Sequence, residues 1–247
     1  EPHTLRLRPR EGHTLRVESS SLAIRPGARL RWYSDVEDNS VAIATFDSPT
    51  RQLAIESEII IQQFNESPLD FLVDDEARDY PFNYDEEARL ILAPYRQGPS
   101  LQATSPLAAW VASLWRPDEP IQTYTLLHRL CAHIPRTLAY QAREQPGVQS
   151  PAETLALGTG SCREFAYLFI EATRSLGLAA RFVSGYLFAE PSASNYGSTH
   201  AWAEVFLPGA GWVGFDPTSG LLTAEGHIPL AATPDPVSAA PVTGAVD

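Results

Sequence analysis

Apolar and polar residues alternate in short runs along the first quarter of the chain. Turn-forming residues such as Gly12, Pro26-Gly27 and Ser48-Pro49 separate these runs. The runs cover residues 4–7, 14–17, 22–24, 30–32, 41–46 and 53–61. A period of two, interrupted by regular turns, is typical of half-buried antiparallel strands. The pattern therefore predicts an N-terminal β-sandwich or half-barrel.

Helical spacing replaces this alternation after an acidic segment, residues 68–97, which we interpret as a connector between domains. Apolar residues recur at helical intervals over 107–114 and 124–134, and again after Cys162. The last stripe consists of Phe165, Leu168, Phe169, Ala172 and Leu176. Because glycines and a serine precede it, the pattern predicts that Cys162 opens a helix.

Strands are predicted to follow this helix. Residues 180–188 are rich in aromatic and branched side chains, and a second strand begins near His200. A Pro-Gly turn at 208–211 leads into a returning strand at 212–216. The sequence thus predicts a helix that begins with a cysteine and packs on an antiparallel sheet.

A thiol, an imidazole and a carboxylate occur in this order at Cys162, His200 and Asp216, which suggests nucleophilic acyl transfer. A helix N-terminus favours an anion, so a thiolate is easier to form at Cys162. The N–H groups there can also hold a tetrahedral oxyanion. His200 begins one arm of the hairpin and Asp216 ends the other, so both are expected at its open end.

The register of this hairpin poses a problem. A tight turn would pair Leu207 with Trp212. The ladder would then place Asp216 opposite Ala203, three residues short of His200. That offset is about 10 Å, too far for a direct hydrogen bond. We therefore expect a bulge or an asymmetric loop.

Four motifs resemble the transglutaminase-like superfamily. They are G-S-C-R-E-F-A-Y (160–167), A-R-F-V-S-G-Y (180–186), H-A-W-A-E-V (200–205) and G-W-V-G-F-D-P-T (211–218). The resemblance implies a papain-related core with Cys162 as nucleophile, His200 as general base and acid, and Asp216 orienting the imidazole. Relatives often have other residues at positions 161, 163, 164 and 167, which bears on substrate preference.

The N-terminal half also resembles a known domain. H-T-L-R-L-R-P-R (3–10) and D-N-S-V-A-I-A-T-F (38–46) are similar to the β-rich domain of bacterial transglutaminase-like proteins, often described as candidate cysteine proteases. The predicted fold class is α+β, an N-terminal antiparallel β-sandwich followed by a papain-like, transglutaminase-like core. The predicted domains are 1–95, 96–227 and a Pro/Ala-rich C-terminal extension, 228–247.

The predicted activity is cysteine-dependent acyl transfer on protein or peptide amides through a thioester. Hydrolysis, by a protease, amidase or deamidase, is favoured over amine crosslinking; the alternative is a non-catalytic peptide- or protein-binding module. Trp202 and Trp212 are candidates to line a substrate groove. Possible second oxyanion donors are Tyr140, Trp110 and Trp115.

Composition limits the partners. The net charge of −12 and the pI of about 4.9 argue against nucleic acid. No stretch is apolar enough to span a membrane, and the first ten residues lack the apolar core of a signal peptide. Two cysteines provide no disulfide framework, so we expect a reducing, cytoplasmic compartment. All 18 basic residues are arginine, which leaves no internal lysine as acyl acceptor. The oligomeric state is left open.

No cofactor or metal is predicted, because nucleotide-loop and EF-hand patterns are absent from the sequence. His128 and His133 are five residues apart and point to different helix faces, so zinc is not expected. His227 is a reserve candidate for the base, more simply explained as a loop residue near the site. Cys131 lies on an apolar helical stripe and is interpreted as core.

Overall fold

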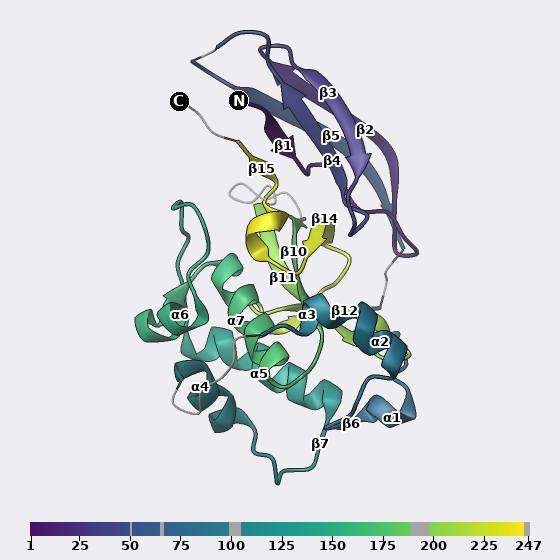
Figure 1. Ribbon diagram of the computed structural model, residues 1–247, viewed down its shortest axis with the longest axis vertical. Coiled ribbons are helices and arrows are strands. Elements are labelled where there is room, and N and C mark those ends of the chain that lie inside the picture. The colour runs from purple at the N-terminus through teal and green to yellow at the C-terminus, as the bar shows by residue number, and fades with distance from the viewer. Residues whose placement is uncertain (50, 65–66, 99–104, 189–197, 245–247) are drawn as a thin grey trace.

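The computed structural model describes residues 1–49, 51–64, 67–98, 105–188 and 198–244. The chain forms a β-rich N-terminal part beside an α/β part that contains a five-stranded sheet (Figure 1). No helix in these described ranges has the length and apolar character that crossing a membrane requires.

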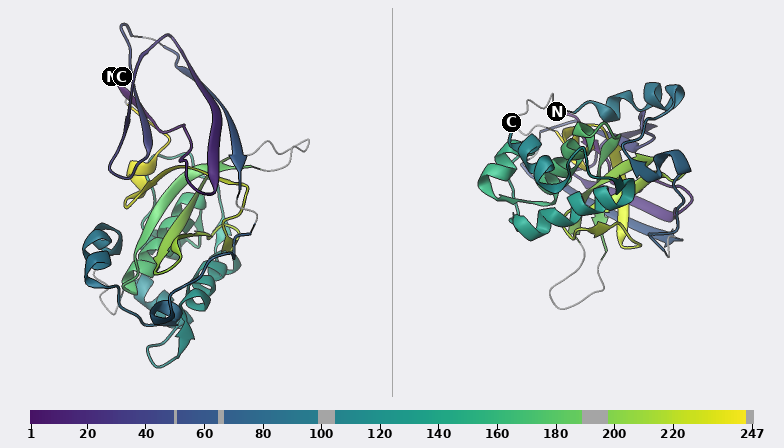
Figure 2. Two further views of the ribbon diagram at one scale, coloured as in Figure 1. Left: turned by 90° about the vertical axis from the view of Figure 1, so that its right-hand side faces the viewer. Right: turned by 90° about the horizontal axis from the view of Figure 1, so that it is seen from below.

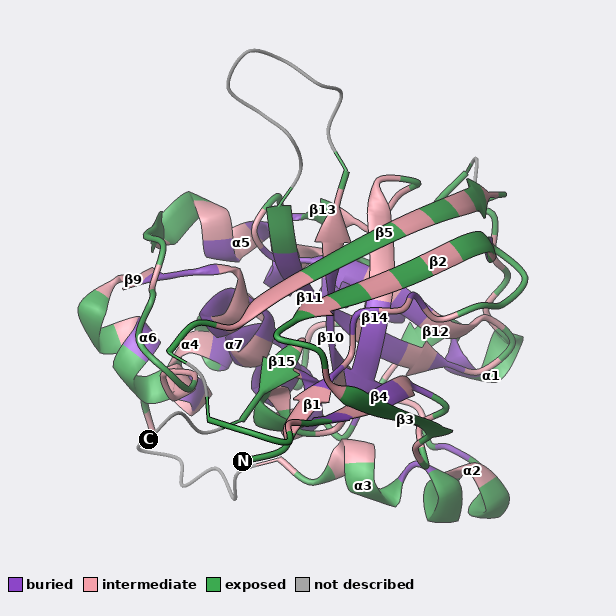
Figure 3. Ribbon diagram, turned by 90° about the horizontal axis from the view of Figure 1, so that it is seen from above, coloured by how far each residue is buried: buried purple, intermediate pink, exposed green. Residues whose placement is uncertain are grey.

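The N-terminal part is a sandwich of two antiparallel sheets. One sheet has the strand order β15-β1-β4-β3, and the other consists of β2 and β5. The strands are β1 His3–Leu5, β2 Leu15–Arg25, β3 Arg29–Ser34, β4 Ser40–Thr45, β5 Ala54–Gln63 and β15 Val242–Thr243. Leu5, Leu7, Ala42 and Ala44 are buried, with partly buried side chains of β2 and β5 packed against them. Figure 3 shows more and less exposed residues alternating along β2 and β5, as the sequence pattern predicts.

β2 joins two segments that the sequence pattern separates, residues 14–17 and 22–24. The polar run Glu18–Ser21 interrupts the apolar alternation. In the structure β5 pairs with the whole of β2, and the register shifts between Val17 and Ser19. Backbone pairing continues across the polar run, so one long strand replaces the two predicted short ones.

The acidic connector, residues 68–97, is folded and packed. It contains three short helices and one short strand: α1 Asp75–Arg78, β6 Asp79–Tyr80, α2 Glu86–Ile91 and α3 Ala93–Arg96. The hydroxyl of Tyr84 donates to the carbonyl oxygen of Phe206 (2.8 Å) and accepts from the Ala179 N–H (3.0 Å). These bonds attach the connector to the α/β part.

Helices cover one side of the five-stranded sheet, as the turned view in Figure 2 shows. They are α4 Pro106–Leu114, α5 Thr123–Thr137, α6 Pro151–Leu157 and α7 Cys162–Ser175, with β7 Ile121–Gln122, β8 Ala139–Tyr140 and β9 Thr159–Gly160 between them. The two earlier helical predictions agree with α4 and α5, and Cys162 does open α7. Phe165, Leu168 and Phe169 of α7 are fully buried in the main core.

The sheet against α7 has the strand order β13-β12-β11-β10-β14. Its strands are β10 Ala180–Leu187, β11 Ser198–Leu207, β12 Gly211–Asp216, β13 Leu221–Leu222 and β14 His227–Thr233. Ala201, Ala203 and Val205 of β11 belong to the core that contains α7. Trp202 belongs to a separate cluster with Val183 and Ala232. Alternate residues of β11 therefore pack into two different clusters, one on each face of the sheet.

The register of the β11–β12 hairpin corrects the expected one by one residue. Leu207 pairs with Gly211, and the pairing continues unbroken to Ala203 and Phe215. Pro208-Gly209 makes the turn, since Gly209 has a φ of +83° and the Ala210 N–H bonds to the Leu207 carbonyl (3.0 Å). Extended by one position, this ladder places Asp216 beside Trp202 and hence on the face of His200. The expected bulge is not needed, because a one-residue slip moves a side chain to the other face.

The C-terminal segment belongs to both parts of the molecule. Residues 228–247, set apart as an extension by their composition, supply most of β14 to the core sheet and β15 to the sandwich, with the 3₁₀ helix Pro236–Ala239 between them. The last residues, 245–247, lie outside the described ranges. Asn39 of the sandwich is fully buried, and its side chain bonds to both the N–H (2.8 Å) and the carbonyl oxygen (3.0 Å) of Ala232 in β14. The two parts are thus joined by backbone pairing and by a buried amide.

Candidate active site

Cys162 is the first residue of α7 and is partly exposed. The buried Glu164 organises this first turn: its Oε2 accepts from the backbone N–H (2.9 Å) and the hydroxyl (2.6 Å) of Ser161. Its Oε1 accepts from Arg143 (2.6 Å). Burial alone would raise the pKa of Glu164, but these hydrogen bonds hold it below its usual value. The turn that carries the thiol is therefore fixed by an ionised, fully bonded carboxylate.

Tyr140 lies beside this turn. β8 and β9 pair in parallel, with Tyr140 opposite Gly160. Burial, followed by its interaction with Cys162, raises the pKa of Tyr140. Trp115 donates its indole N–H to the Glu119 carbonyl (2.9 Å), and Trp110 contacts His133. Tyr140 is the one of these three proposed oxyanion donors that lies beside Cys162.

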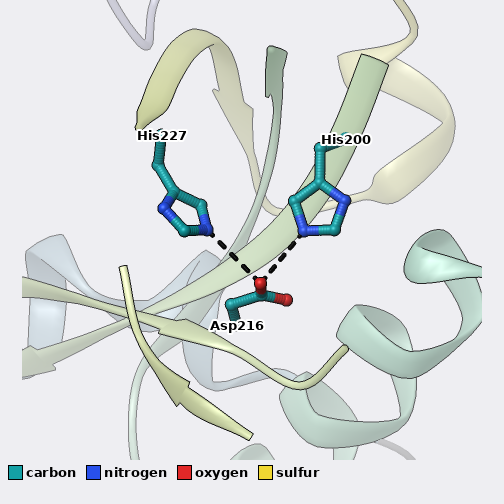
Figure 4. A group of neighbouring side chains, drawn as sticks. All are labelled: His200, Asp216 and His227. Carbon is teal, nitrogen blue, oxygen red and sulfur yellow. Dashed lines mark hydrogen bonds and ion pairs between the residues drawn. The ribbon is translucent and has the colours of Figure 1, made fainter. Parts of the chain in front are cut away.

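His200 is a buried side chain near the start of β11 and pairs with Gly185 of β10. Its Nε2 lies 3.1 Å from Oδ2 of Asp216 (Figure 4). Burial lowers the pKa of His200, but its interactions with Asp216 and with Cys162 outweigh burial and raise it to about 9. The structure thus brings Cys162, His200 and Asp216 together, as the sequence predicts.

Asp216 ends β12, and its two carboxylate oxygens have different partners. Oδ1 accepts from the backbone N–H of Thr218 (2.9 Å), which closes the Asp-Pro-Thr turn. Oδ2 faces the imidazole rings. Burial opposes ionisation, but the bonds from His200 and then His227 hold the pKa of Asp216 well below its usual value. The turn role and the site role foreseen for this residue are compatible.

His227 is the site residue that sequence reasoning placed least well. It is the first residue of β14 rather than a loop residue, and its Nε2 lies 3.3 Å from Oδ2 of Asp216. The chain reaches this position through the short strand β13 and a turn at 224–227. No spacing rule links an aspartate to a histidine eleven residues later, so only the paired strands reveal the contact.

His200, Asp216 and His227 place three possible ligand atoms within 4.8 Å of one another. Two imidazoles and a carboxylate are ligands that zinc accepts. The spacing of His128 and His133 gave no indication of this group. The backbone N–H of Ala224 donates to Nδ1 of His227 (3.1 Å). The proton of neutral His227 therefore sits on Nε2, the atom that would have to bind a metal. As arranged, the group fits a hydrogen-bond network better than a metal centre.

The two tryptophans proposed for a substrate groove line one cleft, which His227 also lines. Trp202 is buried, and its ring centroid lies 6.3 Å from that of His200. Trp212 begins the strand that Asp216 ends, and it contacts Tyr95 and the guanidinium of Arg181. Trp202 thus packs beside the imidazoles, and Trp212 lies at the other end of β12 from Asp216 but still lines the cleft that contains His227.

Comparisons with known proteins agree with the fold. Residues 109–217 match the model of the transglutaminase-like superfamily, and residues 1–62 match that of the bacterial transglutaminase-like N-terminal region. Together these matches show that the chain belongs to the transglutaminase-like superfamily. The first match includes Cys162, His200 and Asp216.

Individual relatives are more distant. An uncharacterised protein of Mycobacterium tuberculosis is 29% identical over 154 residues, which are 59% of this chain and 48% of the relative. YebA of Bacillus subtilis, also uncharacterised, is 38% identical over 71 residues, 25% of this chain and 10% of the relative. The chain thus spans half or less of the length of the curated relatives it matches.

A crystal structure from Cytophaga hutchinsonii, described as a "putative cysteine protease", has a similar fold. The TM-score is 0.73 at 18% identity, and the match covers 98% of this chain and 79% of the other. At this level of identity the likeness is one of fold. It extends over the sandwich as well as the core.

Proposed function

We propose that this protein is a cysteine-dependent enzyme that transfers acyl groups from protein or peptide amides through a thioester. The observation that carries the proposal is the arrangement at one end of the sheet: a thiol opening a helix, an imidazole that interacts with it, and a buried carboxylate 3.1 Å from that imidazole. A nucleophile, a proton carrier and an orienting acid are the parts that covalent acyl transfer needs.

In the proposed first half-reaction, the Cys162 thiolate attacks the carbonyl carbon of an amide. The backbone N–H groups at the start of α7, with Tyr140 as a second candidate donor, stabilise the tetrahedral oxyanion. The C–N bond breaks as His200 gives its proton to the leaving nitrogen. The products are a thioester on Cys162, neutral His200, and the free amine or ammonia.

In the second half-reaction, neutral His200 takes a proton from the acceptor as that acceptor attacks the thioester. Water as acceptor gives a carboxylic acid, and a primary amine gives a new amide. Either route restores the Cys162 thiolate and the His200 imidazolium. Water at about 55 M prevails unless the site binds and orients an amine, so we favour hydrolysis.

The decisive experiment incubates a library of glutamine-containing peptides with the protein, with and without a primary amine, and analyses the products by mass spectrometry. Cleavage, a mass gain of one dalton, or amine incorporation would identify protease, deamidase or crosslinking activity respectively. The protein has no lysine, so any isopeptide bond to lysine must involve the added substrate.

Cys162→Ala is the matched inactive variant, and Cys131→Ala controls for the loss of a thiol elsewhere. We expect product with wild type and Cys131→Ala but none with Cys162→Ala. Peptide that is bound and never turned over by wild type would instead favour the alternative, a non-catalytic binding module.

A further inference from the structure

Two imidazoles converge on one carboxylate oxygen. Oδ2 of Asp216 lies 3.1 Å from Nε2 of His200 and 3.3 Å from Nε2 of His227 (Figure 4). The two rings have centroids 5.8 Å apart. The acyl-transfer mechanism uses His200 and leaves His227 without a role. Its side chain is nevertheless only 11% exposed, so its position is fixed by the fold.

The backbone determines which tautomer His227 adopts. The Ala224 N–H donates to Nδ1 (3.1 Å), and the His227 N–H returns a bond to the Ala224 carbonyl (2.9 Å). A backbone N–H can only donate, so Nδ1 must accept through its lone pair. The hydrogen of the neutral ring is therefore on Nε2, which points at Asp216. His227 is thus a donor to Oδ2 while it is neutral.

A buried indole packs against both imidazoles. The Trp202 ring lies edge-on to His227, with centroids 5.2 Å apart and an interplanar angle of 85°, and 6.3 Å from His200. The ring sits directly over Gly185, where a Cβ would come within 2.4 Å of it. A strand without a side chain at 185 thus allows Trp202 to hold both rings beside Asp216.

From this geometry we propose that His227 is a positioning residue: through its Nε2–H it holds the Asp216 carboxylate so that Oδ2 stays directed at His200. This inference rests on the proposed function, in which Asp216 orients His200. His227 touches no reacting atom and acts through Asp216. Without this donor the carboxylate keeps the Thr218 bond at Oδ1, but Oδ2 is free to turn away from His200.

Other ionisable groups near His227 belong to several elements. Asp216 and His200 are its closest neighbours, Glu225 lies in its own turn, and Asp70 and Glu204 line the same cleft. Glu204 is paired with Arg181 at 2.7 Å. Among these charged groups, Asp216 forms a hydrogen bond with the His227 ring.

The test compares three substitutions at position 227 with a control. His227→Leu removes the donor at similar size. His227→Asn keeps an amide too short to reach Asp216, and His227→Gln places an amide N–H near the position of Nε2. His133→Leu is the matched control, because His133 also packs on a tryptophan but lies outside the cluster. Thermal unfolding identifies any variant that fails to fold. If His227→Leu does not fold, the result for His227→Asn tests the proposal.

The first readout is the titration of His200, followed by ¹⁵N NMR of its imidazole, which needs no substrate. We expect its pKa to fall from about 9 toward 6.5 by about one unit or more in the Leu and Asn variants. We expect the Gln variant and the His133 control to keep the wild-type titration. An unchanged His200 titration in His227→Leu and His227→Asn would overturn the proposal.

The second readout is turnover of a peptide found active with wild type. Loss of the donor should lower kcat by about tenfold or more, the usual scale for an outer hydrogen-bond partner of a site, with recovery in His227→Gln. A wild type with no turnover of any peptide would count against the proposed enzyme. The NMR titration would still decide whether His227 holds Asp216, so the two failures are distinguishable.

Discussion

The two cysteines lie on neighbouring helices of one core, yet their surroundings differ. Cys162 opens α7, is partly exposed and interacts with His200. Cys131 lies within α5, fully buried, with its Sγ 3.8 Å from the Leu221 carbonyl. Burial, then the charge of Asp216, raises the pKa of Cys131 well above its usual value. We therefore expect Cys162, at a helix N-terminus beside an imidazole, to be the reactive thiol, and Cys131 to be inert although it interacts with Asp216.

The largest expected effect follows from removing each thiol in turn. Cys162→Ala should lower kcat/KM on the order of 10⁴-fold or more, because no other group can form the thioester. Cys131→Ala should leave it within about threefold of wild type. Steady-state kinetics on a peptide that wild type turns over measures both effects. Comparable losses in the two variants would contradict the different roles assigned to Cys162 and Cys131.

The next effect concerns Asp216, the carboxylate that faces His200 and also raises the pKa of Cys131. Asp216→Asn should lower kcat about 10³- to 10⁴-fold, because an amide cannot stabilise the imidazolium or hold the ring's tautomer. The same substitution should lower the pKa of Cys131, since one cause of its elevation is the charge of Asp216. Single-turnover kinetics gives the first result. Full activity in Asp216→Asn would remove this residue from the mechanism.

Alkylation sharpens the comparison directly. In the native protein we expect iodoacetamide to modify Cys162 at least about 100-fold faster than Cys131, because Cys131 is buried and its pKa is raised by that burial. Peptide mapping by mass spectrometry after timed quenching gives both rates. The difference should vanish in denaturant, where both thiols are exposed, and equal rates in the native state would contradict the assignment.

The pH dependence of turnover should report His200 rather than Cys131. His200 must be protonated to release the leaving amine, and its pKa is raised to about 9. The protonated form is therefore present below that value, and activity should fall as pH rises through about 9. Cys131→Ala should not change the pH at which activity falls. If turnover of Asp216→Asn still fell near pH 9, Asp216 would not be the cause of the raised His200 pKa.

The smallest effect is on stability. Cys131→Ala should cost about 1–2 kcal/mol of the free energy of unfolding, because it leaves a small cavity among buried side chains. Cys162→Ala should change it by less than about 0.5 kcal/mol. Denaturant titration followed by fluorescence of the five tryptophans measures both changes. A larger cost at Cys162 would indicate that the thiol also supports the fold.

Local pattern was sufficient for much of the fold. The stripe after Cys162 predicted α7, and the aromatic and branched residues of 180–188 predicted β10. Local pattern did not predict the features that depend on how the strands pair. A one-residue difference in register moved Asp216 onto the face of His200 and made the expected bulge unnecessary.

The sequence by itself indicated Cys162, His200 and Asp216 as candidate nucleophile, imidazole and acid, because each stands at or near an element terminus that short-range patterns specify. Only the tertiary structure brought His227 to Asp216, paired Asn39 with Ala232, and joined the last strand to the first. The physical reason is that these contacts depend on strand order and register. Both are set by the packing of segments far apart along the chain, which no local periodicity records.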